Sequence, residues 1–324
     1  MEKNTGKTQT LNYVLKRLGL FYEKKIGLTS IGIDGEKEDI LHKTSKPEII
    51  INPNTIFVTD RTLYRQKEVV SDILYVTQRR TALGEIVYAE AKTKGKVLLS
   101  GPSTTKWLKE VVEKLNSLGC DIVLVDGALD RRSLSSPLIT DAMILSTGAV
   151  LSRSEKIIAK KTYLLYLLTL LEKTELSNKL MDIDNGIYSI TDNEEIIPLN
   201  IPSTLMIESY KDVLFSYGYK LFISGIITDK LLLWLKMQKN VENIEIIVKD
   251  FTKIFCSKEA LDGFFHKGGK LKVVYPANLI AITVNPFSPS NGYHLNSDNI
   301  IKELKKYIKD IPIYNIIKSA TDLY

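Results

Sequence analysis

Met1-Glu-Lys-Asn-Thr-Gly-Lys-Thr-Gln-Thr10 is the segment from which the rest of the chain is interpreted. Within it, Gly6-Lys7-Thr8 has the form of the end of a phosphate-binding loop. We expect the backbone N–H groups of this loop to surround phosphates, an exposed Lys7 to reach the outer phosphates, and the Thr8 hydroxyl to hold Mg²⁺. The residues assigned to phosphate binding are Asn4, Thr5, Gly6, Lys7, Thr8 and Gln9.

A helix is predicted directly after this loop. Apolar residues recur at helical spacing over residues 11–18, and Gly19 stands where the helix is expected to stop. The positive end of the helix dipole would then point at the bound anion.

Two parts of a complete phosphate-binding loop are missing. The loop needs a glycine five positions before Gly6 and a strand that leads into it, but Met1 occupies the glycine position. Either the coding sequence starts upstream of Met1, with a GUG or UUG codon read as Met1, or the protein has lost tight nucleotide binding. We favour the first explanation, which predicts about ten further in-frame residues that encode an apolar strand and a glycine.

The composition is that of an ordinary globular protein, with 44% hydrophobic and 25% charged residues among 324. The formal charge of +6 comes from lysines spread through predicted helices, so we expect no nucleic-acid partner. No apolar run reaches the roughly 18 residues of a membrane span, and the N-terminus has no signal-peptide pattern. Cys120 and Cys256 lack metal-ligand spacing, so we expect reduced thiols in a cytoplasmic protein without a membrane partner.

Two apolar runs end in Asp-Gly, at Asp34-Gly35 and at Asp126-Gly127. Ligand sites in open α/β sheets lie at the carboxyl ends of buried parallel strands. Asp34 either faces Mg²⁺ or a nucleophile, or makes a turn. Asp126 has the form of the carboxylate that fixes magnesium in a P-loop enzyme, the alternative being a simple turn or cap. Lys7, Asp34 and Asp126 are therefore the candidate catalytic residues.

The segment around Asp126 predicts a parallel βαβ unit and an anion-binding loop. Residues 96–100 form the first strand, a helix runs through Leu118, and residues 120–125 form the second strand. In the polar loop that follows, Arg131 and Arg132 either clamp a phosphate or a carboxylate or make surface salt bridges.

A single α/β domain of P-loop type is predicted over residues 1–324, with a mostly parallel, doubly wound sheet whose first strand is missing. Residues 46–95 read as antiparallel strands that are inserted in the main sheet or added to its edge. Residues 187–190 and 195–198 predict a β-hairpin. Strands and helices still alternate beyond residue 209, so we extend one sheet to the C-terminus.

A late strand over residues 280–284 ends in Asn285-Pro286. An asparagine pairs with both donor and acceptor edges of a purine, but it equally caps a turn before Pro286. His294 lies in the same loop and is given a structural role.

The order of a Gly-Lys-Thr helix, a strand ending near Asp34, a strand ending in Asp126 and a strand ending in Asn285-Pro286 resembles the dethiobiotin synthetase and MinD branch of P-loop proteins. In that branch the late asparagine contacts the base, and the resemblance implies this role for Asn285. The chain departs from the MinD pattern at position 2, where the signature lysine would fall and Glu2 stands instead, with Lys3 next.

A closer resemblance is carried by Leu28-Thr-Ser-Ile-Gly-Ile-Asp-Gly-Glu36, Gly101-Pro-Ser103, Asp126-Gly-Ala-Leu-Asp-Arg-Arg-Ser-Leu-Ser-Ser-Pro137, Thr140-Asp141 and Ser146-Thr-Gly-Ala149. These look like the reactivase subunit associated with adenosylcobalamin-dependent lysine and ornithine aminomutases, well over residues 1–150 and loosely beyond. The resemblance implies an ATP- and Mg²⁺-dependent factor that works with a MutS-like partner subunit to release damaged cobalamin from the aminomutase. No residue by itself indicates cobalamin binding.

Three functions follow from these observations. In the first, a reactivation or assembly factor hydrolyses nucleotide, and hydrolysis releases the loops after Asp34 and Asp126 together with a protein partner. In the second, a ligase or kinase of dethiobiotin synthetase type holds a substrate carboxylate with Arg131 or Arg132. In the third, a catalytically silent binding subunit keeps the fold without the activity.

Overall fold

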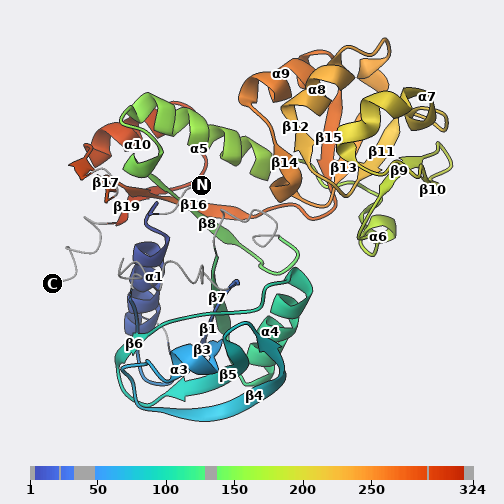
Figure 1. The fold of residues 1–324 in the computed structure, drawn as a ribbon. Helices are drawn as coiled ribbons and strands as arrows, with labels where there is room; N and C mark the ends of the chain where they lie inside the picture. The colour runs from blue at the N-terminus through green and yellow to red at the C-terminus, as the bar shows by residue number, and fades with distance from the viewer. Residues whose placement is uncertain (1–3, 22, 33–47, 128–136, 290–291, 317–324) are drawn as a thin grey trace.

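The computed structural model describes residues 4–21, 23–32, 48–127, 137–289 and 292–316. The chain has an α/β fold, in which helices cover two five-stranded sheets and one three-stranded sheet (Figure 1). Across these described ranges, no helix is long and apolar enough to cross a membrane.

The first sheet contains the strands that follow the first helix. Its spatial order is β4 (Ser71–Thr81), β5 (Gly84–Ala91), β3 (Ile56–Asp60), β1 (Ile26–Ser30) and β7 (Ile122–Asp126). β3, β1 and β7 run parallel, whereas β5 and β4 pair antiparallel at one edge. The central strands β1 and β3 are buried on both faces, whereas β7 at the other edge is half-buried along its whole length.

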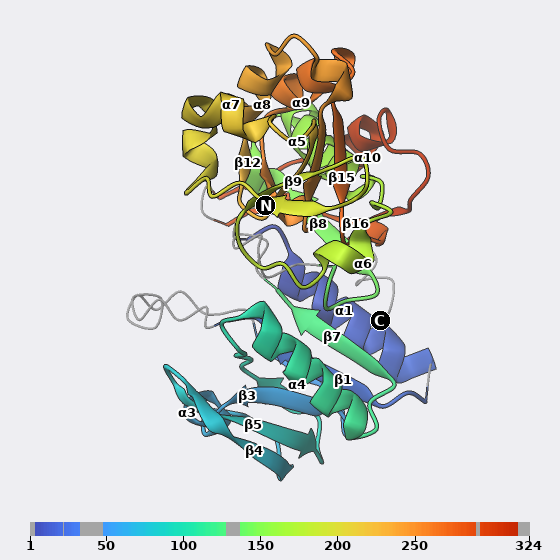
Figure 2. The same cartoon turned by 90° about the vertical axis from the view of Figure 1, so that its right-hand side faces the viewer.

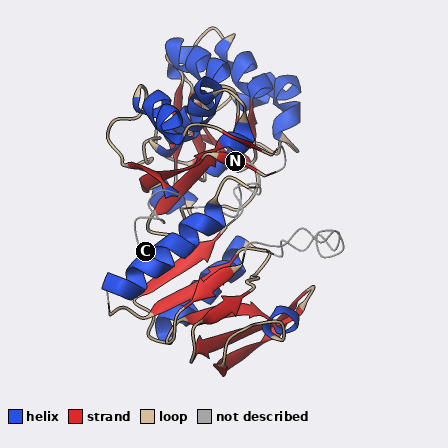
Figure 3. Cartoon of the chain, turned by 90° about the vertical axis from the view of Figure 1, so that its left-hand side faces the viewer, coloured by secondary structure: helices blue, strands red, loops and turns tan. Residues whose placement is uncertain are grey.

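Both faces of the first sheet are covered (Figure 3). One face packs against α1 (Lys7–Phe21) and the antiparallel pair of β2 (Ile49–Ile51) and β6 (Gly95–Val97), and the other packs against α4 (Thr105–Ser117). Leu11 and Leu15, one helical turn apart, turn the same stripe of α1 to the sheet. Val111 and Leu115 do the same for α4.

The second sheet is parallel and has three strands. Its order is β19 (Ile313–Asn315), β16 (Leu279–Asn285) and β8 (Met143–Gly148). One face is covered by α5 (Glu155–Thr169) and α10 (Ser297–Lys305), whose apolar residues pack on Leu145, Ile282 and Val284. The opposite face carries hydroxyl groups and meets the start of α1, as described below.

The third sheet is formed by residues that lie between α5 and β16 in the sequence. Its order is β10 (Ile196–Pro198), β9 (Ile187–Ile190), β11 (Lys220–Ile223), β13 (Glu245–Val248) and β15 (Lys270–Val273). One face is covered by α8 (Asp229–Lys236) and α9 (Lys258–His266), and the other by the segment with α6 (Ser177–Leu180).

Short elements complete the chain. They are α3 (Arg61–Tyr64), α7 (Lys211–Leu214), the 3-10 turns η2 (Ala149–Leu151), η3 (Thr204–Tyr210), η4 (Val241–Asn243) and η5 (Phe251–Lys253), and the pairs β12 (Ile227–Thr228) with β14 (Ile254–Phe255) and β17 (Phe287–Ser288) with β18 (Tyr293–His294).

The expectation of one sheet extending to the C-terminus is wrong. The local alternation of strands and helices does not say which strands are neighbours. Here β9 and β10 form the expected hairpin, β11 pairs with β9, and the sheet then grows through β13 to β15 without joining β8 or β16.

The expected parallel unit over residues 96–125 is also wrong. The first of the two expected strands is only Gly95–Val97, and it pairs antiparallel with β2. The parallel partner of β7 is β1 instead. The residues after β6 are bonded to β3 through side chains instead of by strand pairing. The Thr59 hydroxyl donates to Leu98 O, and Asp60 N donates to the Ser100 hydroxyl. The chain therefore leaves the strand early and crosses the end of β3.

The first helix does not stop at Gly19 but continues to Phe21. A Cβ on Gly19 would lie 2.6 Å from Nδ2 of Asn52. The glycine therefore gives room for the Asn52 side chain rather than ending the helix.

Candidate functional site

The first turn of α1 has a backbone conformation that requires glycine. Gly6 has φ +94°, and a Cβ at this position would lie 2.9 Å from Cβ of Asn285. The helical hydrogen bonds begin at Thr10, whose N–H donates to Gly6 O over 2.9 Å. The N–H groups of residues 7–9 therefore have no acceptor within the helix, which is the arrangement that favours an anion at a helix N-terminus.

Three buried hydroxyls join α1 to the second sheet. Thr10 Oγ1 lies 2.8 Å from Oγ1 of Thr283 on β16 and 3.2 Å from Oγ of Ser146 on β8. Thr283 donates to Ser146 over 2.9 Å, and Thr10 donates to Gly6 O over 3.0 Å. These hydroxyls are removed from water and satisfy one another, so they fix the start of α1 against β8 and β16.

Asn285 ends β16 and holds the residues that precede α1. Its Nδ2 donates to Asn4 O over 3.2 Å, and its Oδ1 accepts from Phe287 N over 3.1 Å. Gly148, at the end of β8, comes so close that a Cβ there would lie 2.0 Å from Asn285 O. The turn-making role is therefore present, and it uses one of the two N–H donors and one of the two oxygen lone pairs of the Asn285 amide.

The carboxyl ends of β1 and β7 lie at the same end of α1 as this turn. A short connection joins α1 to β1, so the two run in opposite directions, and the first turn of α1 lies where β1 finishes. Ser30 of β1 pairs with Asp126 of β7, and Ile31 N donates to Asp126 O over 3.0 Å. Figure 2 shows α1 alongside β7, with its first turn at the end toward which β7 points.

The structure brings several of the predicted residues together. Asn4 and Gly6 lie against Asn285, and Asp126 ends β7, which points toward the first turn of α1. Lys7 differs from the expectation of an exposed loop residue, because it is the first residue of α1 and is half-buried. Asp34, Arg131 and Arg132 fall outside the described residues.

The hydroxyl cluster of Thr10, Ser146 and Thr283 was missed by the sequence interpretation. The signal was present, because each of the two strands carries a hydroxyl residue near the end of an apolar run: Ser146, followed by Thr147, in β8 and Thr283 in β16. What the sequence did not give was their partner on α1, since the contact from Thr10 to Thr283 spans 273 positions.

Divalent-ion chemistry at this site would depend on few protein ligands. The described part of the chain has no group of three or more His, Cys, Asp or Glu side chains that could hold a metal ion. Mg²⁺ bound with a nucleotide commonly uses one or two protein oxygens together with phosphates and water, so Thr8 and Asp126 have the donor chemistry for that mode.

The two cysteines offer no nucleophile for this site. Both are free thiols, Cys120 buried and Cys256 half-buried. Burial raises the pKa of the Cys120 thiol to about 11, so little thiolate is present at neutral pH.

The described geometry therefore gathers the ends of β1, β7, β8 and β16 around the start of α1. Such a meeting of parallel strand ends with a helix N-terminus is where α/β proteins bind phosphate-bearing ligands. Comparison of the chain with protein-family models, curated proteins and solved structures found no match.

Proposed function

We propose that this protein binds ATP with Mg²⁺ at the start of α1 and uses nucleotide hydrolysis to grip and release a protein partner. The observation that carries the proposal is the meeting of four parallel strand ends with the glycine turn at Gly6 and the first N–H groups of α1. Backbone N–H groups and the helix dipole both attract phosphate at such a position.

Each residue of the turn has a distinct part in this proposal. The positive φ of Gly6 allows successive backbone N–H groups to face one anion, and Lys7 adds a positive charge at the first helical position. The Thr8 hydroxyl and the Asp126 carboxylate would hold Mg²⁺, which when bound offsets the charge on the phosphates. Asn285 acts as a positioning residue, since it holds Asn4 O and abuts Gly6.

The two sheets have edges that one further strand would join. Among the described strands, β7 pairs only with β1 and β8 pairs only with β16, and α1 contacts both. A strand parallel to both, leading into residues 4–6, would cover the half-buried edge of β7 and link the sheets.

The protein partner follows from the resemblance stated above. We propose a cobalamin-dependent aminomutase as the client, with a MutS-like subunit in the same complex. Loss of the outer phosphate would change the contacts of the residues after β7 and so alter the grip on the partner, as in other phosphate-sensing proteins.

A direct test is nucleotide binding measured by the anisotropy of a fluorescent ATP derivative. We expect Lys7→Ala and Asp126→Asn to weaken Mg²⁺-dependent binding by at least about tenfold, since each removes a charged contact. Lys239→Ala is the matched control, because Lys239 is an exposed lysine in the turn after α8, away from the start of α1. Equal affinity of Lys7→Ala and the unmodified chain would overturn the site.

Turnover assays separate the three functions. Hydrolysis stimulated by the aminomutase supports the reactivation factor, and hydrolysis that needs a carboxylated small molecule instead identifies a ligase or kinase. A chain that binds no nucleotide is a silent binding subunit.

A further inference from the structure

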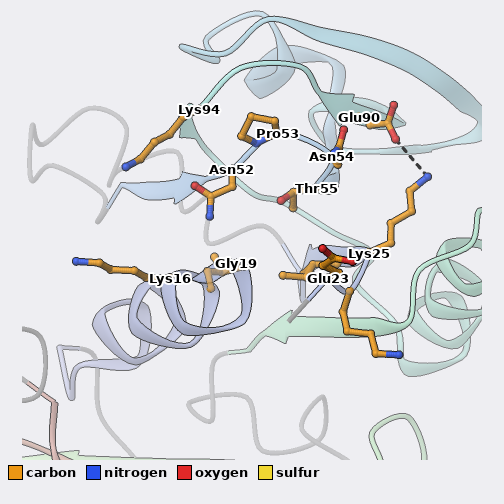
Figure 4. Close-up of a pocket in the computed structure, with 13 residues that line it drawn as sticks. Lys16, Gly19, Glu23, Lys25, Asn52, Pro53, Asn54, Thr55, Glu90 and Lys94 are labelled. Carbon is orange, nitrogen blue, oxygen red and sulfur yellow. Dashed lines mark ion pairs between the residues drawn. The ribbon is translucent and has the colours of Figure 1, made fainter. Parts of the chain in front are cut away.

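A cavity lies at the opposite end of α1 from the proposed nucleotide site. It has a volume of about 760 Å³ and is lined by the C-terminal half of α1, the start of β1, the turn between β2 and β3, and the end of β5 (Figure 4). Gly19 in its wall is about 18 Å along the helix from Lys7, at 1.5 Å per residue. The cavity is therefore separate from the proposed nucleotide site.

The charge of the lining is positive. Four lysines and two glutamates line the cavity, a formal net charge of +2: Lys16, Lys24, Lys25, Lys94, Glu23 and Glu90. Glu90 is already neutralised, because it forms an ion pair with Lys25 over 3.2 Å and another with Lys92. Hydrogen bonds from these two lysines hold the pKa of Glu90 below its ordinary value.

Lys94 and Lys16 place positive charge on one side of the cavity. Within the part of the chain that the structure describes, Lys94 has no carboxylate partner. Figure 4 shows Lys16 and Lys94 extending to the same side of the cavity, one from α1 and one from the turn after β5, with Asn52 between them. An anion on this side would meet two ammonium groups at once.

Two neutral polar side chains also face the cavity without a partner. Thr55 is only 4% exposed, and its hydroxyl has no hydrogen bond to any described residue. Thr55 is one of the residues that line the cavity. Buried hydroxyls are normally satisfied, so this one is available to a ligand.

The Asn52 side chain also lines the cavity, and it occupies space that a side chain at Gly19 of α1 would need. Its Nδ2 lies where Gly19 would carry a Cβ, 2.6 Å away, and its side-chain amide likewise lacks a described partner. A glycine inside a helix costs about 1 kcal/mol relative to alanine. The helix accepts this cost where the Asn52 amide approaches it.

We propose that this cavity binds a small organic anion through a phosphate or carboxylate group held by Lys16, Lys94, Asn52 and Thr55. Its volume is within the range of small-molecule sites, and Leu15, Ile26 and Pro53 offer an apolar wall for the body of the ligand. The ammonium groups provide the attraction, while the amide and the hydroxyl fix orientation.

The test is calorimetric titration of the full chain with pyrophosphate and, separately, with citrate. Both titrations are performed on the Lys7→Ala background, so that anion binding at the start of α1 does not contribute. We expect Lys94→Ala to weaken binding about tenfold and the isosteric Thr55→Val to weaken it about three- to tenfold, as for loss of one charged and one neutral contact. Lys109→Ala, at an exposed lysine of α4, should leave binding unchanged.

The two probes also identify the ligand chemistry. Tighter binding of pyrophosphate indicates a phosphate ligand, and tighter binding of citrate indicates a carboxylate ligand. The proposal is overturned if neither probe binds. It is also overturned if Lys94→Ala and Thr55→Val bind the probes as tightly as the Lys7→Ala background does. Neither result bears on the proposed nucleotide site, which is tested separately by ATP binding to the Lys7→Ala and Asp126→Asn variants.

Discussion

Replacing Thr10 by valine should release the start of α1 from the second sheet. Valine keeps the shape of threonine but removes the hydroxyl that contacts Gly6 O, Ser146 and Thr283. Each hydroxyl has one proton, so not all of these contacts are made at once. If Thr283 donates to Ser146, then Ser146 donates to Thr10 and Thr10 donates to Gly6 O, which gives Thr10 two hydrogen bonds.

The size of the effect follows from those two bonds. A buried hydrogen bond contributes about 0.5–1.5 kcal/mol, so Thr10→Val should cost about 1–3 kcal/mol. Because the lost contacts join α1 to another sheet, the cost should appear as easier local opening of α1. Amide exchange in the peptide covering residues 4–21 should accelerate about 5- to 150-fold, at 1.4 kcal/mol per factor of ten.

Hydrogen exchange followed by mass spectrometry measures this opening, and Thr169→Val is the matched control. Thr169 is also a buried helical threonine, but its hydroxyl bonds only to Tyr166 O within α5. The control should lose stability in α5 and leave residues 4–21 unchanged. Equal exchange of α1 in Thr10→Val and in the control would refute the reasoning that these hydroxyls hold the helix.

Three further outcomes are expected. Gly6→Ala should weaken nucleotide binding at least about tenfold, since φ +94° and the 2.9 Å contact with Asn285 both oppose a side chain. The control Gly119→Ala, at φ +85° with no atom within 4 Å of the added Cβ, should lose stability without losing binding. A similar loss of binding in both variants would contradict the role of the contact with Asn285. In the native state Cys120 should react with a thiol reagent at pH 8 about a hundredfold more slowly than an ordinary cysteine, because burial raises its pKa to about 11; labelling at the unfolded rate would contradict this. Burial and the hydrogen bond to Asp310 raise the pKa of Tyr166 to about 12, so the folded state favours the neutral phenol and stability should be lost as pH rises from about 10 to about 12. The urea midpoint of Tyr166→Phe should fall less over this pH range than that of the unmodified chain. An equal fall in both midpoints would count against the assignment.

The sequence predicted local structure well where periodicity is strong. The apolar spacing over residues 11–18 identified α1, and the β-hairpin of β9 and β10 is confirmed. Both features are set by neighbouring residues, namely a helical stripe and a tight turn. The end of α1 was misplaced because Gly19 does not end the helix but makes room for the side chain of Asn52, a residue from another element.

Strand pairing could not be predicted from the sequence, because an apolar run does not specify which strand will lie beside it. Residues 96–100 were predicted to form a parallel strand, but the strand that forms is Gly95–Val97, which pairs antiparallel with β2. Likewise, β11 pairs with a hairpin strand instead of extending the first sheet. The site shows the same division. Gly6-Lys7-Thr8 was found from its own chemistry, whereas the hydroxyls on β8 and β16 gain meaning only when α1 meets them.

The central claim is that one ligand, a nucleotide with Mg²⁺, lies between the start of α1 and the end of β7. The most direct measurement is a crystal structure with a non-hydrolysable ATP analogue and Mg²⁺. We predict phosphates against the N–H groups of Gly6, Lys7 and Thr8, with the ion between the Thr8 hydroxyl and Asp126. Crystals in which the analogue lies only at the other end of α1, beside Lys16 and Lys94, would contradict the claim.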